Sequence, residues 1–125
     1  MKTPVRPPTM KYPVPLSPGV MANGFLFVSG FGPQDPTTGG VPDGIEEQTR
    51  ATLANLTLVL AEAGLDLSDV VKVTVHLRNL EGDFVAYNDA YSAVMPAPYP
   101  SRITVGSDLI MGILVEMDAI AVLRT

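Results

Sequence analysis

Hydrophobic residues recur at helical spacing in two segments of the chain. In each segment four apolar positions are spaced so that they lie on one face of an α-helix. The first stripe consists of Leu53, Leu56, Leu60 and Ala63. The second consists of Phe84, Tyr87, Tyr91 and Val94. The stripes predict one helix from about Asp43 to Gly64 and another from about Asp83 to Met95.

Residues at the ends of both segments support these limits. Asp43 and Glu46 have the spacing of a capping box, and Gly64 suits the left-handed position that ends many helices. The second helix is followed by Pro96, Pro98 and Pro100, which cannot continue it.

The other hydrophobic segments have the patterns of β-strands. Residues 70–77 alternate between apolar and polar positions, and residues 20–30 are largely apolar on both sides of Asn23-Gly24, a dipeptide that favours a type I′ hairpin turn. Two more strands are predicted at residues 101–105 and 113–124. The element order is then β-β-α-β-α-β-β.

This order predicts a single α+β domain over residues 1–125, with residues 1–13 as an irregular proline-rich arm. Two amphipathic helices can cover only one face of the sheet, so we expect two layers with the other face open. The residues assigned to the open face are Lys72, Thr74, His76, Arg78, Leu114, Glu116, Asp118, Ile120 and Val122. A face of such mixed character suits a subunit interface, and we predict a homo-oligomer whose sites lie between subunits.

Composition excludes several kinds of chemistry. The chain has no cysteine and one histidine, His76, so thiol nucleophiles and ordinary zinc sites are excluded. We interpret His76 as a residue on the polar face of its strand.

Charge and hydrophobicity limit the binding partners and the cellular location that we expect for the protein. A net charge of −5 with only 8 basic residues argues against nucleic-acid binding. No stretch approaches the ~20 apolar residues of a membrane span, and we see no signal peptide. We therefore expect a cytoplasmic protein that binds neither nucleic acid nor membrane.

Two carboxylates, Glu116 and Asp118, interrupt the last predicted strand, which is otherwise apolar. Burying an ionised carboxylate without partners is costly, so we expect each of the two acids to have a structural or chemical role. Arg102 can hold a carboxylate ligand through two parallel charge-assisted hydrogen bonds, so Arg102 and Glu116 facing one small site would suit an enzyme for small acids. If the last two strands form a hairpin, however, the same pair can be a structural ion pair. For Asp118 we favour an ion pair with Lys72 or Arg78.

A series of short motifs runs in order from about Val14 to Val122. The motifs are Val28-Ser29-Gly30, Gln48-Thr49-Arg50, Asn55-Leu56, Val59-Leu60-Ala61-Glu62-Ala63-Gly64, Asp69-Val70-Val71-Lys72, Asp83-Phe84, Asn88, Pro100-Ser101-Arg102 and Val115-Glu116-Met117-Asp118-Ala119-Ile120-Ala121. In order and spacing they resemble the reactive-intermediate deaminase family, also called RidA or YjgF.

The resemblance implies a chorismate-mutase-like fold, a homotrimer with sites at the subunit clefts, and neither cofactor nor metal. It implies hydrolysis of small enamine or imine acids, such as 2-aminoacrylate, to a 2-keto acid and ammonia. Arg102 matches the family's carboxylate-binding arginine, and Glu116 matches the acid that activates water. Ser29 and Gly30 match the site loop, where N–H or hydroxyl donors face developing charge, and Asn88 matches an asparagine near the cleft. Ser29 is expected to be a loop hydrogen-bonder and not a nucleophile.

The chain departs from the family pattern at the predicted cleft. Leu16 stands where a tyrosine is usual, Phe31 where a glutamine is usual, and Ile103 is bulkier than the residue usual after the arginine. An apolar lining favours a larger or less polar imine than 2-aminoacrylate, or another small amide or carbamoyl acid. It also leaves open a noncatalytic module that binds small carboxylates. A ribonuclease activity, sometimes attached to this family, fits the acidic charge poorly.

Overall fold

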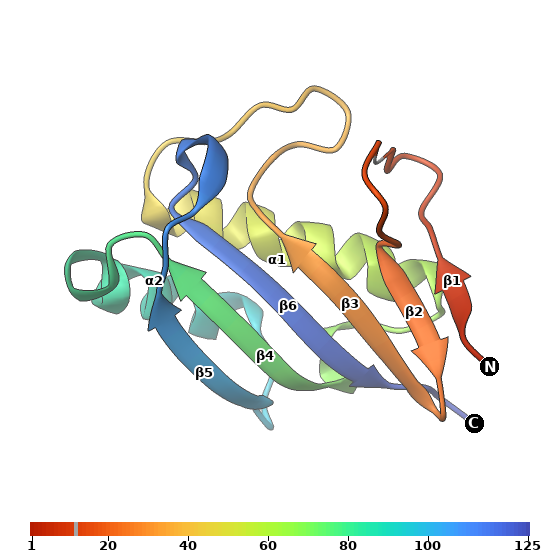
Figure 1. Ribbon diagram of the computed structural model, residues 1–125. Helices are drawn as coiled ribbons and strands as arrows, with labels where there is room; N and C mark the ends of the chain where they lie inside the picture. Colours follow the sequence, from red (N-terminus) through yellow and green to blue (C-terminus); the bar gives the residue numbers. More distant parts are fainter. Residues whose placement is uncertain (12) are drawn as a thin grey trace.

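Figure 1 shows a computed structural model of the chain, which describes residues 1–11 and 13–125. The described residues form one sheet with the strand order β1-β2-β3-β6-β4-β5. The strands are β1 (Thr3–Val5), β2 (Gly19–Ala22), β3 (Phe25–Phe31), β4 (Val70–Leu77), β5 (Ser101–Gly106) and β6 (Val115–Val122). The helices are α1 (Ile45–Glu62) and α2 (Leu80–Val94), with short 3-10 turns η1 (Leu67–Asp69) and η2 (Ile110–Gly112). Both α-helices lie behind the sheet in Figure 1, so the predicted two-layer α+β fold is confirmed.

The hairpin between β2 and β3 forms where the sequence predicts it. Asn23 and Gly24 have φ angles of 51° and 82°, and Ala22 pairs with Phe25 across the turn. Both turn residues need positive φ in a type I′ turn, which an asparagine followed by a glycine tolerates best.

The amino-terminal arm is less irregular than predicted. Thr3–Val5 forms β1, which pairs antiparallel with β2 at the edge of the sheet. Val5 is buried there against the core. The prediction of an irregular arm over residues 1–13 was therefore wrong for these three residues, because an exposed sheet edge gives even a proline-containing segment hydrogen-bond partners.

Helix α1 begins two residues later than predicted. Its N-cap is Gly44 at φ 83°, without a side-chain cap, so the capping box of Asp43 and Glu46 does not form. Its end is as predicted, because Gly64 adopts φ 74° and the N–H of Leu65 donates to the carbonyl of Leu60.

Helix α2 begins three residues earlier than predicted. Asn79 is the N-cap and accepts a hydrogen bond from the N–H of Gly82. In its predicted apolar stripe only Tyr87 and Tyr91 are buried, whereas Phe84 and Val94 are exposed. Neither α1 nor α2, nor any other helix in the described part of the chain, combines the length and the hydropathy needed to cross a membrane.

The last two strands do not form a hairpin. β4 lies between them, parallel to β5 and antiparallel to β6. A parallel pair needs a long crossover, which α2 supplies between β4 and β5, and the chain then has to pass over the end of β4 to reach β6. This order decides which side chains can meet.

The two faces of the sheet differ in burial as predicted. On β6, Val115, Met117, Ala119 and Ala121 are buried under the helices, whereas Glu116, Asp118 and Ile120 are only partly buried on the open face. The open face also carries Phe25 and Phe27, which are 39% and 44% exposed. Large apolar side chains left this exposed on a sheet mark a surface that another molecule can cover.

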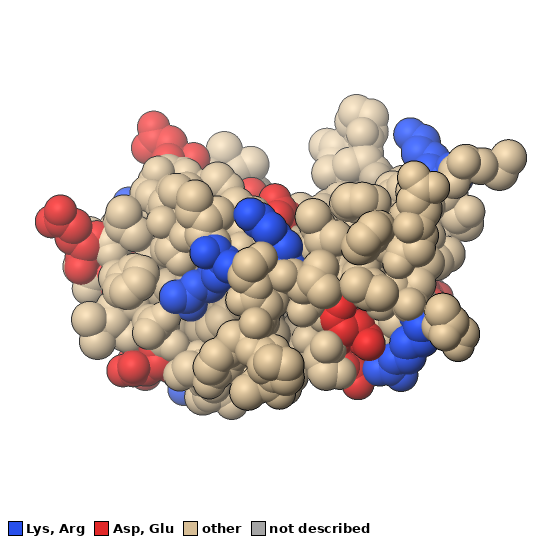
Figure 2. All heavy atoms as spheres, turned by 90° about the horizontal axis from the view of Figure 1, so that it is seen from below, with Lys and Arg blue, Asp and Glu red and all other residues tan. Residues whose placement is uncertain are grey.

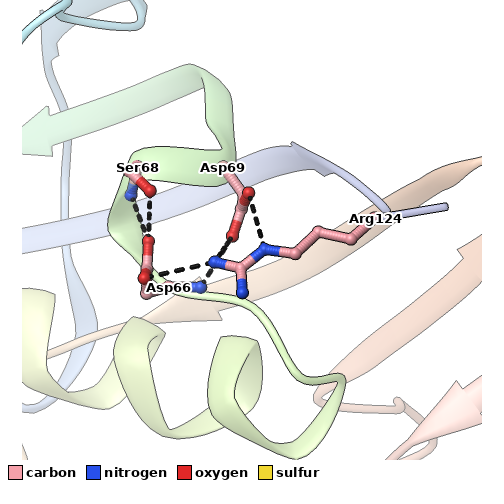
Figure 3. Close-up of polar contacts among 4 residues, drawn as sticks. All are labelled: Asp66, Ser68, Asp69 and Arg124. Carbon is pink, nitrogen blue, oxygen red and sulfur yellow. Dashed lines mark hydrogen bonds and ion pairs between the residues drawn. The ribbon is translucent and has the colours of Figure 1, made fainter.

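An ion-pair cluster ties the carboxyl-terminal end of the chain to η1 (Figure 3). Arg124 donates to Asp69 at 2.8 Å and to Asp66 at 3.2 Å. Asp66 also accepts from the hydroxyl and the N–H of Ser68. These hydrogen bonds from Ser68, with Arg124, lower the pKa of Asp66, and those from Arg124 and from the Asp66 N–H lower the pKa of Asp69.

This cluster leads to a prediction about acid stability. Because both carboxyl groups have lowered pKa values in the folded chain, their contribution is present at neutral pH and is lost as the pH falls through those values. Arg124→Met should therefore lower Tm by about 1–3 °C near pH 7, since exposed ion pairs stabilise weakly. The deficit should shrink once both acids are protonated.

Thermal unfolding followed by circular dichroism from pH 7 to pH 2 measures this effect. Arg50→Met is the control, since Arg50 forms an exposed ion pair with Glu47 one turn away within α1. A Tm deficit of Arg124→Met that stays constant down to the lowest pH would contradict the prediction.

Candidate functional site

A cavity of about 560 Å³ lies at the end of the sheet where β3 ends and β6 begins. We call it the Glu116 cavity. Three segments far apart in sequence surround it: the segment before β2, the loop after β3 and the η2 turn. All three lie at the upper end of the sheet in Figure 1. The described lining residues are Met10, Lys11, Pro13, Val14, Leu16, Gly30, Phe31, Gly32, Gln34, Asp35, Pro36, Asn55, Ile110, Met111, Ile113 and Glu116.

Glu116 and Gly30 meet in this cavity. A methyl group built on Gly30 would lie 3.0 Å from Oε2 of Glu116, so the absence of a side chain at Gly30 makes room for the carboxylate. Glu116 of β6 pairs in register with His76 of the neighbouring strand β4. Among the described residues no basic side chain forms an ion pair with Glu116, which leaves this carboxylate open to a ligand or to water.

Two buried amides on α1 hold the walls of the Glu116 cavity. Asn55 donates to the carbonyls of Gly32 and Gln34 at 2.9 and 2.8 Å. Gln48 accepts from the N–H of Leu114 at 2.8 Å and so ties the entry of β6 to the helix. We missed this role from sequence, although two amides seven residues apart on the buried side of a helix were a usable signal.

Arg102 lines a second cavity, of about 370 Å³, between α2 and the start of β5. We call it the Arg102 cavity. Its lining residues are Asn88, Tyr91, Ser92, Tyr99, Pro100 and Arg102. Two of the predicted site residues, Arg102 and Asn88, come together here, since Nη2 of Arg102 donates to Oδ1 of Asn88 at 2.8 Å.

Two tyrosines of α2 hold the guanidinium of Arg102. Its central carbon lies 5.3 Å from the ring centre of Tyr87 and 4.7 Å from that of Tyr91, distances at which a cation is attracted to an aromatic face. The Tyr87 hydroxyl bonds Thr104 of β5 at 2.7 Å. Burial raises the pKa of Tyr91 to about 12, so its phenol stays neutral. These contacts fix Arg102 without neutralising it.

Arg102 and Glu116 are not brought together within one chain. On β4, Arg102 is in register with Val73 and Glu116 with His76, and positions three residues apart on a strand point to opposite faces. The structural ion pair between them is therefore excluded within a chain, and so is a one-chain site that contains both. The physical reason is the register in which β5 and β6 pair with β4.

Ser29 of β3 has a structural role, because it binds the segment that precedes β2. Its hydroxyl donates to the carbonyl of Ser17 at 2.6 Å and its N–H to that of Pro18. Ser29 and Gly30 lie in β3 and not in the loop that the resemblance implies, and Ser29 forms hydrogen bonds as expected; its role in substrate binding stays a prediction. Its hydroxyl and its N–H hold the segment before β2 against β3, beside the Glu116 cavity.

The remaining charged residues of the open face differ from the predictions. Arg78 donates to the carbonyls of Ile113 and Leu109, and neither it nor Lys72 forms an ion pair with Asp118 among the described residues. The expected pairing of Asp118 was wrong, because the chain crossing over the end of β4 supplies carbonyls to Arg78. His76 lies on the polar face as expected and bonds Ser107 at 2.6 Å through Nδ1.

Charge is unevenly distributed over the surface. Figure 2 shows one face that is mostly uncharged, on which basic side chains form small groups and acidic groups lie both at the edge and beside the basic ones. Within the described residues no three histidine, aspartate or glutamate side chains gather as a metal site would require.

Comparison with known proteins identifies the family. The model of the family described as endoribonuclease L-PSP matches residues 8–123. A RutC family protein of Pyrococcus abyssi is 42% identical over 118 residues, which cover 90% of this chain and 92% of the relative. The Reactive Intermediate Deaminase A of Arabidopsis thaliana, a chloroplastic protein, is 37% identical over 87% of this chain and 59% of its own.

Solved structures agree in fold over nearly the whole chain. The YjgF gene product of E. coli has a TM-score of 0.91 and 31% identity, and it covers 98% of this chain and 99% of its own. E. coli TdcF, solved with bound serine, has a TM-score of 0.86 and 32% identity, with 93% of both chains covered. With the family match over residues 8–123, these likenesses show that the chain belongs to the RidA, or YjgF, family.

Proposed function

We propose that the protein is a cofactor-independent hydrolytic deaminase of small enamine and imine acids, with its sites between neighbouring subunits of a homotrimer. The observation that carries the proposal is the pair of complementary half-sites. Arg102 is held rigidly without an acidic partner in the described chain, and Glu116 is open without a basic one. A second copy that places its Arg102 cavity beside the Glu116 cavity supplies each charge with its complement.

Two relatives support the substrate class. One is named a reactive intermediate deaminase, and the other was solved with bound serine, which carries the α-carboxylate and nitrogen of an amino acid. A 2-imino acid has the same carboxylate beside a C=N carbon. The planar guanidinium of Arg102 holds such a carboxylate through two parallel hydrogen bonds.

The chemistry requires one water and one proton carrier. Glu116 of the neighbouring subunit takes a proton from water as the water oxygen bonds to the carbon of the protonated imine, giving a tetrahedral carbinolamine. Glu116 returns that proton to the nitrogen and then takes the proton of the carbinolamine hydroxyl as the C=O bond forms and the C–N bond breaks. The departing ammonia takes up that proton as ammonium, and the other product is a 2-keto acid. An enamine enters the same path after protonation at its terminal carbon. Such acid–base assistance accelerates a reaction by about 10²–10⁴-fold.

The test uses an amino-acid oxidase to generate 2-imino acids in situ. We expect the protein to raise the rate of imine loss above the spontaneous rate, with release of one ammonia and one 2-keto acid for each imine consumed. Imine decay at the spontaneous rate for every imine, at micromolar protein, would contradict the proposal.

A noncatalytic small-carboxylate-binding module is the second candidate. The observation that favours it is that Leu16 and Phe31 both line the Glu116 cavity and leave few polar groups there. Such a module would bind 2-keto acids saturably in calorimetry while the imine assay shows no acceleration. The two measurements together distinguish the candidates.

A further inference from the structure

The wall of the Glu116 cavity is apolar over most of its extent. Hydrophobic side chains come from the segment before β2 (Met10, Val14 and Leu16), from the η2 turn (Met111) and from the end of β3 (Phe31). A volume of about 560 Å³ is far more than the CH₂ group of 2-aminoacrylate needs.

Five polar or charged residues, Lys11, Gln34, Asp35, Asn55 and Glu116, interrupt the apolar wall, and two of them are engaged in the loops around it. The amide nitrogen of Asn55 donates to two carbonyls, and Asp35 accepts from the N–H groups of Thr37 and Thr38 at 2.8 and 2.9 Å. Glu116 is the carboxylate assigned to water. A short polar side chain such as that of serine offers this wall little apolar surface and so gains little binding free energy from it, whereas a branched or aromatic side chain covers much more of the wall.

We infer that the substrates of this site are 2-imino acids with branched or aromatic apolar side chains, which occupy the Glu116 cavity while the carboxylate is held by Arg102 of the neighbouring subunit. This inference rests on the proposed function. Each methylene that an apolar pocket takes from water improves kcat/KM by about 10-fold or more. The imine of leucine should then exceed that of alanine by about 10²-fold or more, and the imine of serine should be among the poorest.

Leu16 is the residue through which this preference can be tested. Its side chain lines the cavity from the segment before β2. It is 39% exposed and lies outside the buried core, so its replacement removes no core contact. Leu16→Asn should lower kcat/KM for the leucine imine by about 10-fold and change that for the alanine imine much less. Leu58→Asn is the matched control, because Leu58 is also 39% exposed but lies on α1 outside the cavity.

The experiment has two readouts. The first is kcat/KM for imines generated from alanine, serine, leucine and phenylalanine, in the wild type and both variants. The second is calorimetric binding of the matching 2-keto acids, which needs no turnover and should follow the same order.

The outcomes separate the two levels of the argument. Turnover that favours the alanine or serine imine overturns the side-chain preference and leaves the deaminase function standing. No turnover of any imine, with keto acids still bound in the predicted order, overturns the deaminase function and supports the preference. An equal loss in Leu16→Asn and Leu58→Asn also counts against the role of the cavity.

Discussion

Co-expression of the Arg102→Ala and Glu116→Gln variants should restore activity that neither variant has alone. Each single change should lower kcat/KM by about 10²–10⁴-fold, because one removes the carboxylate anchor and the other the proton carrier. If every site takes Arg102 from one subunit and Glu116 from the next, random assembly leaves both residues intact at about one quarter of the sites.

The measurement is ammonia release by the co-purified mixture, compared with each variant alone. Arg50→Ala and Glu62→Gln change charge at exposed positions of α1 and should leave activity unchanged. Arg102→Lys should recover only part of the loss, because an ammonium lacks the planar fork. Absence of any recovery in a mixture shown to contain both chains would mean that the site is not shared between subunits.

Phe27→Glu should convert the proposed homotrimer into monomers and remove the proposed deaminase activity with it. Phe27 lies on the open face between Val20 and Ile120, its register partners on the two neighbouring strands, so an introduced carboxylate has only apolar neighbours there. An unpaired charge buried at an interface costs about 3–5 kcal/mol, and symmetry repeats that cost in every subunit.

Sedimentation velocity at micromolar concentration measures the change, and circular dichroism checks that the monomer stays folded. Val85→Glu is the control, because Val85 lies on α2 and is 71% exposed. We expect this control to remain oligomeric and active. A wild-type protein that sediments as a monomer, or a Phe27→Glu monomer with full activity, would contradict the subunit arrangement.

Features that depend on neighbouring residues could be predicted from the sequence. The β4 strand has the predicted bounds, and Asn23-Gly24 forms the predicted turn with both φ angles positive. Gly64 ends α1 because a left-handed residue is needed there and glycine adopts that conformation without strain. Each of these signals acts over a few residues, so its context is present in the sequence itself.

Features that depend on distant segments were missed or wrong. β1 forms only because the edge of β2 is available to pair with it. The roles of Gln48 and Asn55 depend on loops that the fold brings to α1 from up to 66 residues away. Tyr87 and Tyr91 were predicted to lie on the apolar face of the second helix, and nothing local indicated that they also hold Arg102.

The sequence by itself determined both α-helices and the strands other than β1, because periodicity and turn chemistry are local, and its resemblance to the family singled out Arg102 and Glu116 as candidate site residues. Only the tertiary structure decided that β4 separates β5 from β6 and in which register both pair with it, and thus that Arg102 and Glu116 point to opposite faces of one sheet. Strand order is set by which long-range pairing buries the most apolar surface over the whole chain, and no single segment encodes that choice.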